Sequence, residues 1–139
     1  MRFVLSKEMK ITLTNDQQEH LCTKENIKII ALKKGVLTFD IYEYESLIGF
    51  AQLYEYEASC YFLWNYAIDI NYQNKHLGTK ALKELIIFLK NNYDLKEMTT
   101  TYIFGNDIAK HVYEKVGFVE TDVVDEDGVH EVNMKYVVE

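Results

Sequence analysis

The chain has 139 residues, 48% of them apolar and 27% charged, enough for one domain with a single hydrophobic core. Its formal net charge of −7 argues against nucleic acid as a partner, because phosphate binding needs clustered Lys and Arg. An acidic balance suits a cationic small substrate such as an amine, although it more often serves only to keep a protein in solution.

Targeting and metal-binding features are absent from the sequence. No window approaches the roughly eighteen apolar residues of a membrane span, and the N-terminus meets charge too early for a signal peptide. The two cysteines make no disulfide framework, and His20-x-Cys22 is too sparse for a metal site, so ordinary surface packing is favoured there. We therefore expect one cytoplasmic domain over residues 1–139, with no membrane association and no metal.

The first 35 residues predict one strand and two helices. The strand is either Phe3–Leu5 or Lys10–Leu13. A helix over about Asn15–Cys22 starts from a threonine N-cap with a glutamine three residues later. A second helix over Thr23–Lys33 ends at Gly35, a good helix stop.

Three strand-like runs follow. Val36–Tyr44 and Leu47–Tyr56 are rich in Val, Ile, Phe and Tyr, and the turn Glu45-Ser46 between them predicts an antiparallel hairpin. A loop then leads to a central strand from Tyr61 to about Ile70.

The central strand leads through a polar turn, Asn71–Gly78, into a long amphipathic helix. The helix has apolar residues three and four positions apart, at Leu82, Leu85, Ile86 and Leu89. A glycine-bearing turn that joins a strand to a helix leaves several backbone N–H groups unpaired at the positive end of the helix dipole. This junction therefore predicts an anion site, most often a phosphate site.

The C-terminal third predicts a strand, a helix and a hairpin. The strand covers Lys96–Phe104, and the helix begins at the N-cap Asn106 and ends at Gly117. Val119–Val124 and Val129–Val138 flank a turn with an Asp-Gly pair, which is typical of a hairpin. The whole order predicts an α/β fold, a mixed sheet with helices on its faces, in a single domain.

Two segments resemble motifs of the GNAT superfamily of acetyl-CoA-dependent N-acetyltransferases. Gln73-x-x-His76-x-Gly78 resembles the (Gln/Arg)-x-x-Gly-x-(Gly/Ala) turn that holds the pyrophosphate of coenzyme A in that family. Asn106-x-x-Ala109-x-x-x-Tyr113-x-x-x-Gly117-Phe118 resembles its later Asn-x-x-Ala-x-x-Leu-Tyr-x-x-x-Gly-Phe segment. The two motifs stand in the right order with a strand between them, and the resemblance covers about Phe39 to Val138. Within the superfamily, the resemblance is strongest to bacterial diamine or polyamine acetyltransferases.

The resemblance implies a GNAT-type mixed sheet, acetyl-CoA as cosubstrate and a primary amine, small and cationic, as acceptor. Main-chain N–H groups from Asn74 to Thr79 would hold the pyrophosphate, while strand residues would pair with the pantetheine arm and polarise the acetyl carbonyl. Asn106 would contact the arm, and Tyr113 would lie beside the sulfur. The implied cofactor-binding residues are Tyr66, Ala67, Ile68, Gln73, Asn74, Lys75, His76, Leu77, Gly78, Thr79 and Asn106.

The chemistry implied is direct attack of a free amine on the thioester carbonyl, with Tyr113 as the general acid that protonates the leaving thiolate. The general base stays open. Thr101 stands where several relatives have a glutamate and cannot serve as a base, so Glu55, Glu57 and Asp69 are candidates, each also explained as a solvated carboxylate.

Other functions stay open. The chain could acetylate a protein or peptide, or it could bind acyl-CoA without turnover, as the missing glutamate and His76 in place of glycine suggest. A third alternative is an unrelated α/β domain whose turn binds another phosphate. By analogy with relatives that pair through sheet edges, Val129–Val138 could contribute to a homodimer.

Overall fold

The computed structural model describes residues 1–139 and contains one seven-stranded sheet with four α-helices and one short 3₁₀ helix. The elements in chain order are β1 (Arg2–Leu5), α1 (Asn15–His20), α2 (Lys24–Ala31), β2 (Val36–Glu43), β3 (Ser46–Glu57), β4 (Cys60–Ile68), η1 (Ile70–Tyr72), α3 (Leu77–Tyr93), β5 (Glu97–Ile103), α4 (Asp107–Val116), β6 (Val119–Glu126) and β7 (Val129–Val137). The strands lie in the order β1-β2-β3-β4-β5-β7-β6, and only β4 and β5 are parallel.

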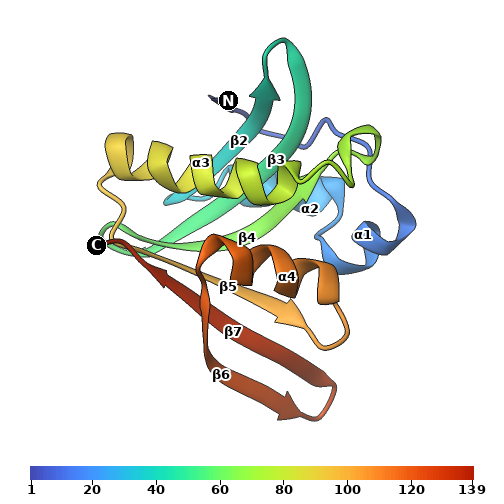
Figure 1. Cartoon of the computed structure of the whole chain (residues 1–139), viewed down its shortest axis with the longest axis vertical. Helices are drawn as coiled ribbons and strands as arrows, with labels where there is room; N and C mark the ends of the chain where they lie inside the picture. Colours follow the sequence, from blue (N-terminus) through green and yellow to red (C-terminus); the bar gives the residue numbers. More distant parts are fainter.

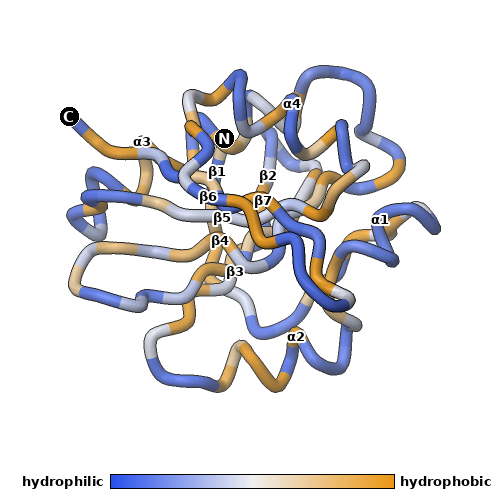
Figure 2. The backbone as a smooth tube through the Cα atoms, turned by 90° about the horizontal axis from the view of Figure 1, so that it is seen from below, coloured by the Kyte–Doolittle hydropathy of each residue, from blue (hydrophilic) through white to orange (hydrophobic).

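Helices cover both faces of the sheet, which confirms the predicted α/β architecture. α3 and α4 lie side by side on one face, over the larger core (Figure 1). On the other face, Ile27 of α2 packs with Phe50 and Ala67, and Figure 2 shows the sheet between α4 and α2. None of the helices has the length and apolar character needed to cross a bilayer.

The N-terminal elements settle the open alternative. β1 covers Arg2–Leu5, whereas residues 10–13 form no strand, although Ile11 is buried against α2. α1 has the predicted threonine cap but ends at His20, earlier than predicted, because Leu21 takes an extended backbone conformation.

Two predicted boundaries in the middle of the chain are wrong by one or two residues. Ser46 pairs with Glu43, so the β2–β3 turn is Tyr44-Glu45, with Tyr44 at a left-handed φ of 55°. β4 ends at Ile68 rather than about Ile70, because the Asp69 carboxylate accepts a hydrogen bond from the Asn71 N–H at 2.8 Å and caps η1.

The C-terminal hairpin is confirmed, but it overturns part of the expectation for a dimer. β7 pairs with β5 on one side and with β6 on the other, so its edges are already used. The free edges of the sheet belong to β1 and β6. Pairing of two sheets at the C-terminal end would therefore require β6 in place of Val129–Val138.

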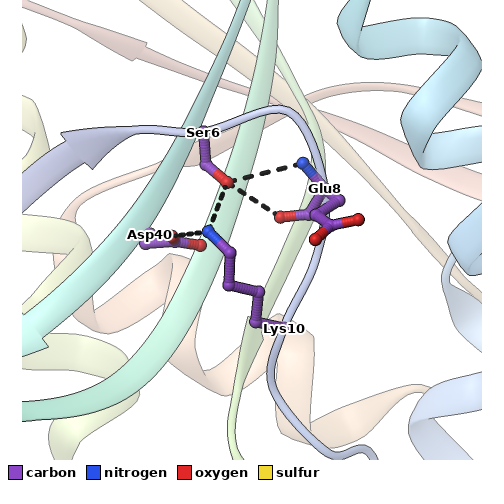
Figure 3. A network of polar contacts seen from close by, with 4 residues as sticks. All are labelled: Ser6, Glu8, Lys10 and Asp40. Carbon is purple, nitrogen blue, oxygen red and sulfur yellow. Dashed lines mark hydrogen bonds and ion pairs between the residues drawn. The ribbon is translucent and has the colours of Figure 1, made fainter.

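A polar contact anchors the segment between β1 and α1 to the sheet (Figure 3). The Lys10 Nζ donates to Asp40 Oδ2 at 2.6 Å and to Ser6 Oγ at 3.1 Å, and Asp40 is only 3% exposed. The hydrogen bond with Asp40 raises the pKa of Lys10. The other Asp40 oxygen is buried without a partner, so Lys10 supplies the compensation for this carboxylate.

We expect Lys10→Met to lower the free energy of unfolding by about 2 kcal/mol, because it leaves a buried carboxylate unpaired. Adding Asp40→Asn should recover part of the loss, since no buried charge then remains. Urea denaturation measures both effects. Lys28→Met, which removes an exposed 3.3 Å pair with Glu8, is the control and should change stability by less than about 0.5 kcal/mol.

Candidate active site

The central feature of the site is the divergence of the two parallel strands. β4 and β5 pair only from Cys60 with Glu97 to Phe62 with Thr99. Beyond this point the strands separate, and the remaining residues of both have free inner edges. The fold thereby opens a gap in the middle of the sheet, next to the N-terminus of α3.

A β-bulge contributes to the divergence. Gln52 of β3 pairs with Asn65 and Leu53 pairs with Leu63, so Trp64 is an extra residue in β4. A bulge bends its strand and increases the local twist. Here it lies directly after the last β4–β5 pair and turns the end of β4 away from β5.

The hydrogen-bond directions in β4 show which peptide groups face the gap. The Asp69 N–H donates to the Ile48 carbonyl in β3, and strand alternation directs the peptide groups of Ala67 to β3 as well. Those of Tyr66 and Ile68 point toward the gap. The Ile68 carbonyl accepts from the side-chain amides of Gln17 and Gln73, both at 3.0 Å.

The turn after β4 has the backbone of an anion site. No main-chain N–H from Gln73 to Thr79 donates a hydrogen bond within the protein, and the first bond of α3 runs from the Lys80 N–H to the His76 carbonyl. These free donors lie at the positive end of a helix of 17 residues. These main-chain N–H groups have no partner in the protein and are available to bind a phosphate at the predicted site.

His76 and Gly78, the two conspicuous positions of the turn motif, differ in backbone conformation. His76, the N-cap, is left-handed with φ of 59°, so it occupies a conformation that favours glycine. Gly78 is helical, and a Cβ there would meet only ordinary contacts, at 3.7 Å from Ile68 and 3.8 Å from Val112. The turn needs glycine-like freedom at His76 rather than at Gly78.

We expect His76→Gly to raise the free energy of unfolding by about 0.5–1 kcal/mol, because glycine adopts a left-handed φ without strain. His76→Ala is the matched control, since it removes the ring and keeps the strain. Urea denaturation compares the two variants. An equal gain in both would attribute the effect to the imidazole instead of the backbone.

A cavity of about 290 Å³ joins the turn, the end of β4 and the start of α4. Every predicted site residue except Lys75 lines it; Lys75 is exposed, with its Nζ 5.8 Å from the Tyr72 ring centre. The Asn106 side chain accepts from the Ala109 N–H at 3.3 Å, which leaves its amide hydrogens free. The lining residues that the sequence did not predict are Thr14, Asp16, Gln17, His20, Leu21, Tyr72, Ile108, Ala109, His111 and Val112.

A second cavity of about 90 Å³ lies in the gap between β4 and β5. The two cavities meet at the six residues that line both: His20, Leu21, Tyr66, Asn106, Ala109 and Tyr113. None of the three carboxylates considered as the general base lines either cavity. They lie elsewhere: the Glu55 side chain accepts from the Ser59 N–H, Glu57 follows it in the β3–β4 hairpin, and Asp69 caps η1.

Two phenols lie where the cavities meet. Burial raises the pKa of Tyr113, and the Thr100 hydroxyl acts in the opposite direction. Burial also raises the pKa of Tyr66, whose hydroxyl donates to the Gly78 carbonyl at 2.5 Å. The Tyr66 proton is thus held in a hydrogen bond to the backbone of α3. Tyr113 stays a protonated phenol at neutral pH, and its hydroxyl has no hydrogen-bond acceptor in the protein.

His20 is the residue that sequence reasoning missed most clearly, since His20-x-Cys22 indicates only surface packing. In the structure it lines both cavities. Neither ring nitrogen makes a hydrogen bond: Nδ1 is buried without a partner, and Nε2 lies 3.9 Å from Asp16 Oδ1. No local pattern carries this signal, because it depends on where α1 lies against β4. No group of three or more His, Cys, Asp or Glu is placed to hold a metal ion.

A sheet that opens at its central strand, beside a phosphate-type turn, defines the acetyltransferase fold. Residues 7–118 match the model of the acetyltransferase (GNAT) family. The chain therefore belongs to this family and is an acetyl-CoA-dependent acetyltransferase. The family assignment inferred from the two motifs is confirmed.

Solved structures agree with the fold. The chain is similar to a GNAT family acetyltransferase from Elizabethkingia anophelis with acetyl-CoA bound (TM-score 0.71, 18% identity, 98% of both chains covered). It is also similar to a variant of spermidine N-acetyltransferase SpeG from Vibrio cholerae (0.68, 19%, 82% of this chain and 72% of that one). A third is aminoglycoside acetyltransferase AAC(6′)-Ib with coenzyme A and kanamycin (0.67, 22%, 83% and 77%).

At these identities the likenesses show a shared fold and no more. A search of curated proteins by sequence finds no match.

Proposed function

We propose that the protein transfers the acetyl group of acetyl-CoA to the primary amino group of a small cationic amine by direct attack. The observation that carries this proposal is the meeting of two cavities at Tyr113, one beside the free N–H groups of the turn and one in the gap between the strands. The first accommodates the cofactor, and the second accommodates the acceptor.

Several groups of the chain fit the cofactor. The N–H groups from Gln73 to Thr79 bind the pyrophosphate, with the dipole of α3 adding to the attraction. The peptide groups of Tyr66 and the N–H of Ile68, on the edge of β4 that faces the gap, pair with the pantetheine arm, and the Asn106 amide donates to the same arm. When bound, acetyl-CoA supplies the activated acetyl group.

Two residues at the meeting point of the cavities, His20 and Tyr113, carry out the two proton transfers of the reaction. His20 takes the proton of the incoming amine on a ring nitrogen and passes it to water, since no other imidazole and no carboxylate lines the smaller cavity. Tyr113 donates its phenolic proton to the leaving thiolate, and burial, which raises its pKa, keeps the proton on the phenol until the thiolate forms. A main-chain N–H of β4 donates to the acetyl oxygen as charge develops there.

The acceptor cavity favours a particular kind of amine. No carboxylate lines it, and Asp16 is the only carboxylate of the larger cavity. A polyamine needs several anionic partners, one for each ammonium group. The lining therefore supports an amine with one or two amino groups over a longer polyamine. Such an acceptor would differ from the spermidine and the aminoglycoside that appear in the names of two similar structures.

The test is acetyl-CoA-dependent thiol release measured with butylamine, putrescine, spermidine, kanamycin and a lysine peptide. The proposal predicts turnover with the first two at higher kcat/KM than with spermidine or the peptide. Turnover with the peptide alone would indicate a peptide acetyltransferase. A rise in melting temperature with both acetyl-CoA and CoA but no product from any amine would indicate a binding module.

A further inference from the structure

Thr100 occupies the point at which the two parallel strands separate. It is the first residue of β5 after the last pair, Phe62 with Thr99, and Leu63 is its counterpart in β4. The Thr100 Oγ1 donates to the Leu63 carbonyl at 3.2 Å, and Thr100 is 1% exposed. One side chain therefore replaces the backbone hydrogen bond that the divergence removes.

The same hydroxyl faces Tyr113. Both residues line the smaller cavity together with Leu63, and the Thr100 hydroxyl is the group that offsets burial of the phenol. Two other neighbours of the ring cannot donate to its oxygen: Phe118 is apolar, with ring centres 5.5 Å apart, and Tyr66 gives its proton to Gly78. The remaining titratable groups of the smaller cavity are His20 of α1 and Tyr102 of β5, whose hydroxyl donates to Glu120 at 3.1 Å.

We propose that Thr100 is a positioning residue for Tyr113, its hydroxyl turning from the Leu63 carbonyl to the Tyr113 oxygen as the phenol gives up its proton. The inference rests on the proposed role of Tyr113 as general acid. In that step the Tyr113 O–H bond breaks and an S–H bond forms on the leaving thiolate. The phenolate then accepts a hydrogen bond from Thr100 until it is reprotonated from the water that received the amine's proton.

The physical need for such a donor is clear. A phenolate in a buried site without a hydrogen bond is strongly disfavoured, and a charge-assisted hydrogen bond compensates for its desolvation. A threonine hydroxyl has one hydrogen and rotates freely about its C–O bond, so it can serve two acceptors in turn. While it serves Tyr113, the Leu63 carbonyl loses its partner only briefly.

The test compares Thr100→Val, Thr100→Ser and the control Thr99→Val, each in the Tyr113 and Tyr113→Phe backgrounds. Thr99 is the adjacent residue of the same strand, on the opposite face. We expect Thr100→Val to lower kcat roughly 10- to 100-fold, the range for a hydrogen bond to a charged group, with KM for acetyl-CoA unchanged. Thr100→Ser and Thr99→Val should keep activity near the wild-type level, and in the Tyr113→Phe background Thr100→Val should cost nothing more.

A second readout needs no turnover. With 3-fluorotyrosine incorporated, the ¹⁹F resonance that disappears in Tyr113→Phe should titrate at higher pH in Thr100→Val than in wild type or Thr99→Val. An equal loss of kcat in both backgrounds, or an unchanged titration, would overturn the inference and leave Thr100 with a structural role only. If the wild type acetylates no amine, the proposed function fails. The ¹⁹F titration still tests whether the Thr100 hydroxyl donates to the Tyr113 oxygen.

Discussion

Replacing Tyr113 with phenylalanine is expected to lower kcat by roughly 10²- to 10⁴-fold, the range for losing a general acid. Stability should be nearly unchanged, because the phenylalanine ring keeps the packing against Phe118. The melting-temperature rise with acetyl-CoA should also persist, since cofactor binding rests on the turn and on β4.

Steady-state thiol release gives kcat, and thermal unfolding with and without acetyl-CoA gives stability and binding. Tyr136→Phe is the control: Tyr136 also packs against Phe118, with ring centres 5.7 Å apart, and lines neither cavity. Because the pKa of Tyr113 is raised, the phenol should keep its proton from pH 7 to about pH 10 and impose no fall in rate there. Full activity of Tyr113→Phe would show that another group or water protonates the thiolate.

The second large effect is expected for His20→Gln, with a fall in kcat/KM for the amine of about 10²-fold near pH 7. Glutamine retains hydrogen bonding but cannot accept a proton. The loss should shrink as the pH rises, because a growing fraction of the amine is already deprotonated in solution. Binding of acetyl-CoA should be similar, since the free N–H groups of the turn are untouched.

The pH dependence of kcat/KM, measured with butylamine, separates this role from simple packing. A packing defect would lower the rate by the same factor at every pH, and such a parallel profile would rule out His20 as the proton acceptor. His130→Gln is the matched control. His130 bonds to Asp125 in the exposed β6–β7 hairpin and lines neither cavity, so its loss should leave the profile unchanged.

The parts of the fold that local physics determines could be predicted from the sequence. The apolar spacing of α3 predicted its buried face at Leu82, Leu85, Ile86 and Leu89, all of which are buried. Gly117 ends α4 in the left-handed conformation, and Asn106 caps its start, as the pattern indicated. Each of these depends on residues within one or two turns of each other.

The divergence of the strands could not be predicted in the same way. It depends on a register shift between β3 and β4, and Trp64 carries no mark that distinguishes a bulged residue from a paired one. The same limit applies to the site. Tyr113 and Asn106 were predicted from one motif, whereas His20 and Thr100 acquire their places only when α1 and β5 are set around β4. Their roles are properties of the tertiary arrangement.

The Ile68 carbonyl, shared by Gln17 of α1 and Gln73 of the turn, has a consequence for affinity. This one oxygen atom connects α1, which carries His20, with the turn that is proposed to bind the diphosphate. A shift of Gln73 on binding of the diphosphate would change the hydrogen bonding of α1 as well. Binding of one substrate should therefore alter the affinity for the other, by the same factor in both directions.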